Sequence, residues 1–330
     1  MKKLAILLTV VFLSAVLIMP AQATIKKVAQ TGLQFLKLDV GGRAAAMGGA
    51  FMMVGNDANA LFYNPAGAAY VPGSLDFFAT QTQWVADITY SAGALVKNLG
   101  NWGTVGLSYL TSDYGDDIIG TVVSTSLQGY EETGKLELGA YTIGLAYARM
   151  LTNKFSIGGQ VKYVSQHLGS SILTAGGNPA ENKVNSVAYD VGTIFYPGFK
   201  SFRLGMAVRN FSPQLKYQQE GFQLPLTFTV GFAMDMLDLM GEHPNHSLVM
   251  AVDAIHPRDY TERIHVGGEY WFMNMLAVRA GYKSNYDVEG LTAGIGAKYG
   301  VGGVNLKVDY SYSDFGAFDA INRFSVGVSF

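Results

Sequence analysis

Apolar and polar side chains alternate with a period of two residues through most of this chain, from about residue 74 to its end. In the last segment, one face has Phe324, Val326, Val328 and Phe330, and the other has Arg323, Ser325, Gly327 and Ser329. Such a strand places one face against an apolar environment and the other against a polar one. The segments are about 9 to 12 residues long, the length that a tilted strand needs to cross a bilayer. Strands of soluble sandwiches usually run to about 5 or 6 residues.

The number and spacing of these segments indicate a closed membrane barrel. We count about fourteen, an even number as in single-chain bacterial barrels. They lie near 74–82, 88–96, 102–110, 139–150, 154–167, 186–196, 201–210, 226–235, 246–255, 262–272, 276–284, 291–300, 303–312 and 322–330. Aromatic residues such as Tyr141 and Tyr163 stand near the segment ends, where membrane barrels have girdles. We predict an all-β fold, a fourteen-stranded antiparallel transmembrane barrel over residues 74–330, with a soluble sandwich as the alternative.

Short and long connections alternate between the segments. The short ones are 97–101, 151–153, 197–200, 273–275 and 301–302, whereas 111–138, 168–185, 211–225 and 313–321 are long and rich in Gly, Ser, Asn and Pro. Outer-membrane barrels have short periplasmic turns and long outer loops. We therefore expect a Gram-negative type of outer membrane, surrounding lipid, and both termini in the periplasm. The connection 236–245 is longer than this pattern predicts.

Composition excludes several classes of site. Charged residues make up 15% of the chain, below the roughly 25% of soluble domains, and the formal net charge is −2, which offers nothing to attract nucleic acid. Cysteine is absent, so disulfides, thiolate chemistry and Cys-ligated zinc are excluded. We expect no cofactor and no metal site.

Residues 1–23 read as a secretory signal peptide. Two lysines precede an apolar run from Leu4 to Met19, and Ala21-Gln22-Ala23 supplies an A-x-A cleavage site. A membrane-anchoring helix is the alternative, but the run falls short of the roughly 20 residues that span a bilayer.

Residues 24–73 precede the first strand and have no sheet pattern. Fourteen strands enclose more space than the 8 strands whose interior side chains can fill, so we predict that this small-residue segment is a hatch inside the lumen. Its candidate binding residues are Arg43, Asp57, Asn59, Tyr63, Asn64 and Pro65. Asn64-Pro65 predicts a stop and a turn. A flexible periplasmic arm is the alternative.

Ionisable residues gather on the faces that we assign to the lumen, because a charge facing lipid at mid-depth costs roughly 2–4 kcal/mol. The main candidates are Arg263, Glu269, Arg279, Lys307 and Asp309. Most such charges pair across a wet lumen, and some are expected to line a path or hold the hatch. His265 and Glu269 share a strand face with Arg263, but no nucleophile stands near them, so we predict that the chain is not an enzyme.

The final strand supplies a second export feature. Phe324, Val326 and Val328 alternate up to a terminal Phe330. This pattern resembles the terminal-strand signal that barrel-assembly machinery reads, and we expect that machinery as a partner.

The predicted hatch also shows a family likeness. Its sequence GGRAAAMGGAFMMVGNDANALFYNPAGAAY includes Gly41, Arg43, Met47, Gly48, Gly49, Ala50, Asp57, Ala58, Ala60, Tyr63, Asn64, Pro65, Ala66 and Gly67. These residues resemble the pattern G-x-R-x-x-x-M-G-G-A, D-A-x-A, aromatic-N-P-A-G of the PorV/PorQ family, which is similar in architecture to FadL-type transporters.

The resemblance implies a non-enzymatic accessory or shuttle of type IX protein secretion and surface attachment. Partners would then include type IX components and the C-terminal domains of secreted cargo. We expect them at the long loops, with Tyr114, Ile118, Ile119 and Tyr130 as exposed contacts. The alternative is a FadL-like transporter of hydrophobic small molecules such as fatty acids or hydrocarbons, which needs a hydrophobic ligand, an apolar pocket above the hatch and a lateral opening.

Overall fold

The computed structural model describes residues 31–330 except 116–117, 173–177, 219 and 242. The predicted signal peptide and residues 24–30 of the predicted hatch lie outside the described residues. No helix in the described parts of the chain is long and apolar enough to cross a membrane.

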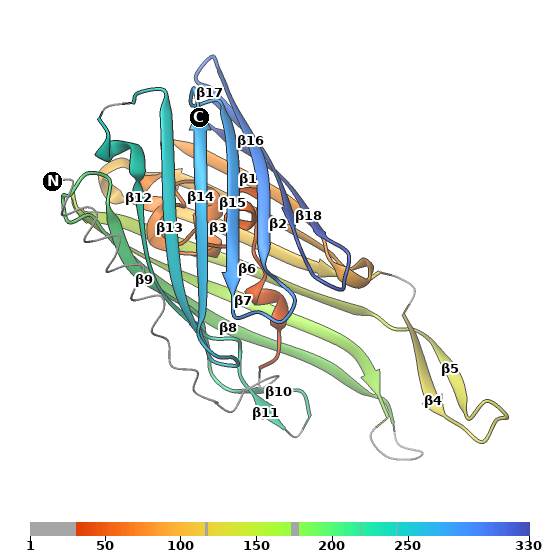
Figure 1. The fold of residues 1–330 in the computed structure, drawn as a ribbon. Coiled ribbons are helices and arrows are strands. Elements are labelled where there is room, and N and C mark those ends of the chain that lie inside the picture. The colour runs from red at the N-terminus through yellow and green to blue at the C-terminus, as the bar shows by residue number, and fades with distance from the viewer. Residues whose placement is uncertain (1–30, 116–117, 173–177, 219, 242) are drawn as a thin grey trace.

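Fourteen antiparallel strands close into one barrel, which confirms the predicted fold (Figure 1). In sequence order they are β1 (Leu75–Gln83), β2 (Thr89–Asn98), β3 (Thr104–Asp113), β6 (Leu138–Thr152), β7 (Phe155–Ser171), β8 (Ala180–Phe195), β9 (Arg203–Phe211), β12 (Thr227–Asp235), β13 (His246–Pro257), β14 (Arg263–Phe272), β15 (Leu276–Ser284), β16 (Leu291–Val301), β17 (Val304–Ser313) and β18 (Ile321–Ser329). The barrel closes where β1 pairs with β18, with Asp76 opposite Ser329 and Gln83 opposite Asn322. Closure leaves the barrel without an exposed sheet edge.

The connections define two ends of the barrel. The short-turn end contains the turns such as 153–154 and 302–303, together with the start of β1 and the end of β18. The long-loop end contains the connections 84–88, 114–137, 172–179, 212–226, 258–262, 285–290 and 314–320. The unexpectedly long turn 236–245 contains a short 3-10 helix, η6 (Met236–Leu239).

Two of the long loops contain strands that the sequence pattern did not predict. The loop after β3 folds into a hairpin of β4 (Ile119–Val123) and β5 (Tyr130–Lys135), which extends well away from the barrel (Figure 1). The loop after β9 contains the short pair β10 (Leu215–Lys216) and β11 (Gly221–Phe222). Both hairpins pair locally, so no long periodic run marks them in the sequence.

Exposure alternates along the wall strands as the period-two pattern predicts. On β6, Tyr141, Ile143, Leu145 and Tyr147 are exposed, whereas Ala140, Thr142, Ala146 and Ala148 between them are buried. The outer surface of the barrel is therefore apolar, and the lumen side is closely packed.

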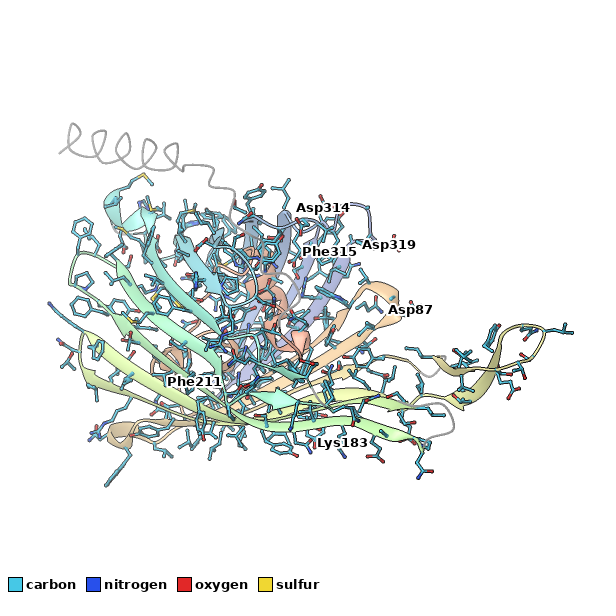
Figure 2. The ribbon with its side chains drawn as sticks, turned by 90° about the horizontal axis from the view of Figure 1, so that it is seen from below. Asp87, Lys183, Phe211, Asp314, Phe315 and Asp319 are labelled. Carbon is cyan, nitrogen blue, oxygen red and sulfur yellow. The ribbon has the colours of Figure 1, made fainter. Side chains whose placement is uncertain are left out.

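The lumen contains the hatch, residues 31–73. It comprises the 3-10 helices η1 (Gln34–Lys37), η2 (Ala58–Phe62) and η3 (Pro65–Tyr70) and the short helix α2 (Gly42–Ala46). Figure 2 shows this segment enclosed by the wall strands. The hatch fills the space with small and apolar side chains, among them Ala44, Met47, Phe51 and Leu61, which are almost completely buried.

The hatch crosses the lumen from one end to the other. Thr31 forms a parallel bridge with Gln223 at the long-loop end, and Ser74 donates a hydrogen bond to the Phe330 carbonyl at the short-turn end (2.6 Å). Thr31 and Phe330 therefore lie at opposite ends of the barrel, because the hatch threads the lumen before β1 begins. The residues before Thr31 lie outside the described part of the chain, so the periplasmic position of both termini stays a prediction.

Glycines of the wall allow the hatch backbone to touch the sheet. A Cβ on Gly281 would overlap the backbone of Gly48, and a Cβ on Gly158 would overlap the backbone between Pro65 and Ala66. Such glycines mark positions where another backbone approaches closely. The lumen wall is therefore shaped to fit this segment.

Because the outward face of the barrel is apolar, the effect of a charged substitution on stability should depend strongly on whether the side chain faces lipid. Leu145, 62% exposed and near the middle of β6, should tolerate arginine poorly in a bilayer. We expect Leu145→Arg to lower the free energy of unfolding by about 2–4 kcal/mol, measured by urea unfolding in phospholipid vesicles. The control Leu127→Arg, in the fully exposed tip of the β4–β5 hairpin, should change it by about 0.5 kcal/mol or less. Equal small effects would contradict a lipid-facing β6.

Candidate functional site

A buried ion-pair network joins the hatch to the wall. Arg43 of α2 binds Glu269 of β14 with two hydrogen bonds, from Nε to Oε2 (2.8 Å) and from Nη2 to Oε1 (2.7 Å). Its remaining Nη1 lies 3.2 Å from Asp57 Oδ2 within the hatch. A bidentate arginine–carboxylate pair is both strong and directional, so it holds the hatch in one orientation.

The wall supplies the other half of this network. Arg279 Nε lies 2.6 Å from Glu269 Oε2, and Arg279 Nη1 lies 2.8 Å from Asp309 Oδ1. Lys307 Nζ lies 3.6 Å from Asp57 Oδ2. Because buried charges are costly unless paired, each of these groups depends on the others for its place in the lumen.

Asp76 connects the hatch to the seam where the barrel closes. Its Oδ1 accepts a hydrogen bond from the Ala58 backbone N–H (2.7 Å), and its Oδ2 accepts one from Ser329 Oγ (2.5 Å). Asp76 stands on β1 directly opposite Ser329 on β18. One carboxylate therefore ties the hatch, the first strand and the last strand together.

The structure brings together most of the charged residues that the sequence pointed to. Arg43 and Asp57 of the hatch meet the lumen residues Glu269, Arg279, Lys307 and Asp309. Arg263 does not join them, since it stands at the opposite end of β14. Its guanidinium lies between the rings of Tyr260 and Tyr286, 4.2 and 3.8 Å from their centroids.

The other hatch candidates are buried. Tyr63 donates from its hydroxyl to the Val40 carbonyl (3.1 Å). The Asn64 side chain accepts a hydrogen bond from Ala66 N–H (3.1 Å) and donates to the Thr193 carbonyl of the wall (3.2 Å). Asn59 is 1% exposed, and neither polar atom of its side chain has a hydrogen-bond partner in the described structure.

Asn64-Pro65 separates two 3-10 helices: η2 ends at Phe62, as the predicted stop requires, and η3 begins at Pro65, which the sequence did not predict. Asn64 is the N-cap of η3, and Pro65 occupies its first turn. Asparagine is among the best N-cap residues, and proline at the first helical position loses no hydrogen bond. The dipeptide therefore starts the helical turn that packs against β6, β7 and β8.

A carboxylate that the sequence did not single out fastens the start of the hatch. Asp259, in the loop between β13 and β14, accepts hydrogen bonds from Thr31 Oγ1 (2.6 Å) and Gln34 Nε2 (3.0 Å) and lies 2.9 Å from Lys37 Nζ. Burial alone would raise the pKa of Asp259, but these donors outweigh it and hold the pKa below its usual value. No local motif marks this residue, because its three partners are distant in sequence.

Two cavities flank the hatch. The long-loop cavity has a volume of about 310 Å³, and hatch residues such as Phe35 and Asp39 and wall residues such as Arg263 and Lys283 line it. The short-turn cavity has a volume of about 360 Å³ and is lined by residues that include Arg43, Lys298 and Lys307. The hatch thus separates two hollow spaces along the barrel axis.

The long-loop cavity is not the apolar pocket expected for a hydrophobic ligand. Phe35, Leu38 and Ile255 contribute apolar surface. However, Lys283 lies between two carboxylates, 2.5 Å from Asp39 Oδ2 and in contact with Glu289. The wall is mixed because the inward strand faces carry polar residues, so only the hatch and a few wall residues supply apolar groups.

The rim of this cavity is aromatic. Phe315, labelled in Figure 2, packs edge-on against Trp84 with ring centroids 5.0 Å apart. Trp84 also packs edge-on against Tyr90, with ring centroids 5.9 Å apart. Trp84 and Tyr90 line the cavity. Loops from opposite sides of the β1–β18 seam therefore close this part of the long-loop end.

The two residues that the sequence considered for hydrolysis, His265 and Glu269, have separate partners. Glu269 is held by Arg43 and Arg279, and His265 Nε2 lies 2.7 Å from the Tyr286 hydroxyl. Among the described residues, no group of three His, Asp or Glu side chains could hold a metal ion.

The proposed partner contacts lie on and beside the β4–β5 hairpin. Ile118, Ile119 and Tyr130 are exposed, as expected. Tyr114 is half-buried instead, because its hydroxyl accepts a hydrogen bond from Gln166 of β7 (3.3 Å).

The predicted assembly residues Phe324, Val326 and Val328 lie on β18, and Phe330 follows directly after it. Phe324 and Phe330 are exposed on its outer face, and Val326 and Val328 between them are partly exposed. The outer face of β18, the strand that closes the barrel against β1, is therefore accessible from outside the barrel.

A family comparison matches residues 11–222 to the uncharacterised protein family UPF0164. The chain belongs to this family. Among curated proteins, no sequence matches it. The match includes the hatch and the first seven of the fourteen barrel strands, so the UPF0164 pattern covers the lumen plug as well as half of the wall.

Solved structures similar to this UPF0164 member include FadL-like barrels. The CymD monoaromatic hydrocarbon channel has 12% identity and a TM-score of 0.54, covering 90% of this chain and 97% of that one. The Pseudomonas putida toluene transporter TodX has 14% identity and a TM-score of 0.51, with 86% and 96% covered. A Pseudomonas aeruginosa FadL homologue has 14% identity and a TM-score of 0.50, with 87% and 96% covered. These likenesses show that the chain has the FadL-like barrel fold.

The Asp259 contacts predict that the attachment of the hatch at the long-loop end depends on pH. Because the pKa of Asp259 is lowered in the folded state, its stabilisation is complete above the ordinary aspartate pKa of about 4 and is lost as the pH falls through the folded value. We expect Asp259→Asn to lower the free energy of unfolding by about 1.5–3 kcal/mol at pH 7, and by much less at acid pH, measured by urea unfolding. The control Asp319→Asn removes an exposed loop carboxylate (Figure 2) and should have little effect at either pH. A loss of unfolding free energy in Asp259→Asn that is the same at both pH values would contradict this attachment.

Proposed function

We propose that this chain is a non-enzymatic outer-membrane barrel that transports hydrophobic small molecules past its hatch. The observation that supports this most is the closed barrel whose lumen is blocked by a hatch with a cavity on each side. A permanently open lumen of this strand number would leak, whereas a hatch between two cavities allows stepwise passage. The FadL-like neighbours include proteins described as a hydrocarbon channel and a toluene transporter.

The setting that we propose is the outer membrane of a Gram-negative type of cell. The apolar outer surface supports contact with lipid, and the outward face of β18 supports recognition by barrel-assembly machinery. The short-turn end would face the periplasm and the long-loop end the exterior. In this orientation Thr31, at the start of the described hatch, lies on the exterior side.

Transport predicts saturable uptake that depends on the hatch. Proteoliposomes with the full barrel should take up labelled toluene faster than empty liposomes and with saturation. Glu269→Gln removes the charge that holds Arg43 and Arg279, so the loosened hatch should raise the unsaturable leak at least about threefold, since breaking a buried pair costs about 3–5 kcal/mol.

The matched control is Glu262→Gln, which removes an exposed carboxylate beside His256 and should behave as the wild type. All variants must first show the heat-dependent gel shift of a folded barrel. Uptake by the wild type that neither saturates nor exceeds that of empty liposomes would overturn the transport proposal.

A second candidate is the PorV/PorQ-type role in type IX secretion and surface attachment. The extended β4–β5 hairpin supports it, since Ile119, Val123, Leu127 and Tyr130 are exposed there without a cover. Exposed apolar groups of this kind are common at protein-binding sites. The cargo C-terminal domain or a type IX component would dock on this hairpin.

The hairpin gives this candidate a direct test. We expect purified barrel to retain secreted proteins that have a C-terminal sorting domain, and to retain at least about tenfold less after replacement of 119–135 by a short Gly-Ser linker. Among the described strands, β4 and β5 pair with each other and not with the barrel, so the barrel should stay folded. Unchanged recovery of cargo would exclude the hairpin as the docking site.

A further inference from the structure

Three arginines line the long-loop cavity without a carboxylate partner. Arg209, Arg263 and Arg323 all border this space, and no carboxylate of the described residues lies within 4.0 Å of any of them. The other two cations of the lining are paired, Lys37 with Asp259 and Lys283 with Asp39 and Glu289. The unpaired positive charge of the cavity therefore belongs to the arginines.

Each arginine is held in place by neutral groups. The Arg209 Nη1 donates to the Phe62 carbonyl, and its guanidinium lies 5.7 Å from the Tyr63 ring centroid. Arg263 lies between two tyrosine rings, as described above. These contacts orient the guanidinium groups, but they do not neutralise them.

Arg323 has the strongest need for a further hydrogen-bond acceptor among the three arginines. It is 1% exposed, its Nη1 donates to Ser313 Oγ (2.9 Å), and its Nε has no hydrogen-bond partner. Arg263 Nε is likewise buried and unpartnered. A buried charge with unfilled donors is unfavourable, and an anion in the cavity would supply an acceptor of the kind that these donors lack.

Asp253 is the acid of the lining that has no ion-pair partner among the described residues. Asp253 uses Oδ2 to accept the Met52 backbone N–H (3.0 Å), and its Oδ1 has no partner. Lys283 carries one positive charge against the two carboxylates of Asp39 and Glu289, so the three arginines face Asp253 and one further negative charge, which leaves a net charge of about +1. A neutral hydrocarbon would leave this charge uncompensated, whereas a ligand with one anionic group would offset it.

Size and wall chemistry restrict the rest of the ligand. A volume of about 310 Å³ is at the lower end of the roughly 300–1,000 Å³ of small-molecule sites, so the ligand is compact. Phe35, Trp84 and Tyr90 supply flat apolar surface to the same space. Aromatic rings pack well against such surfaces in offset or edge-on contacts.

We propose that the long-loop cavity binds a small aromatic carboxylate, with the carboxylate held by Arg209, Arg263 and Arg323 and the ring against the aromatic wall. The guanidinium fork matches a carboxylate with two parallel hydrogen bonds. The inference rests on the proposed function only in taking this cavity as the ligand site, and it names the chemical class that the site selects.

The test is direct binding to the purified full-length barrel in detergent micelles. Benzoate is the probe, titrated by calorimetry, with benzamide and toluene as uncharged compounds of similar size. We expect benzoate to bind at least about tenfold more tightly than either, and more weakly as salt concentration rises. Equal binding of benzamide or toluene would overturn the proposal, and so would tighter binding of octanoate, an aliphatic carboxylate without a ring.

Variants assign the effect to the arginines. Arg263→Gln and Arg209→Gln should each weaken benzoate binding about tenfold, and Arg263→Lys should recover part of the loss because it keeps the charge without the planar fork. Arg149→Gln, on an exposed residue of β6, is the matched control and should bind benzoate as the wild type does. All variants are compared after the gel-shift test for folding. Unchanged affinity in both Gln variants would overturn the proposal.

This experiment separates the inference from the proposed function. Benzoate binding without any uptake in proteoliposomes would keep the site and remove transport. Saturable toluene uptake without benzoate binding would keep transport and remove the anionic ligand.

Discussion

The Arg43–Glu269 ion pair is the interaction on which the rest of the lumen depends. A fourteen-strand barrel encloses more space than its wall side chains can fill, and the hatch occupies that space only if its polar backbone and charges are satisfied there. Glu269 is shared by Arg43 of the hatch and Arg279 of the wall, while Asp76 bonds both the hatch and Ser329 at the seam. Filling the lumen and closing the barrel are therefore coupled.

The two cavities follow from the same arrangement. Because the hatch is fixed by its contacts at mid-lumen and again by Asp259 at the long-loop end, the space that it leaves is divided into two parts. The wall around that space must carry polar side chains on its inward faces, which explains why the long-loop cavity is lined by paired charges and three unpaired arginines. A barrel built for a purely apolar ligand would need apolar residues on faces that the strand pattern makes polar.

Much of the fold was predictable from local pattern, and part of the candidate site was too. Period-two alternation identifies each wall strand, since outward side chains meet one environment along the whole strand. Arg43, Asp57, Glu269 and Arg279 could be nominated because charges in such a barrel have to point inward. The β4–β5 hairpin, the helix that begins at Asn64 and the isolation of Arg263 from Glu269 could not be predicted. Each depends on local pairing or on distance along a strand, which composition and alternation do not report.

The sequence by itself determined the closed barrel and the inward placement of its charges, because alternation and strand length have one physical solution in a bilayer. Only the tertiary structure decided which charges are neutralised. Arg279 finds Glu269 and Asp309, Lys283 finds Asp39 and Glu289, and Arg323 finds no carboxylate among the described residues, although all three stand on inward faces. Strand register decides the first case, since Arg279 stands directly opposite Glu269. The path of the hatch decides the second, because it brings Asp39 to Lys283 from more than two hundred positions away in the sequence.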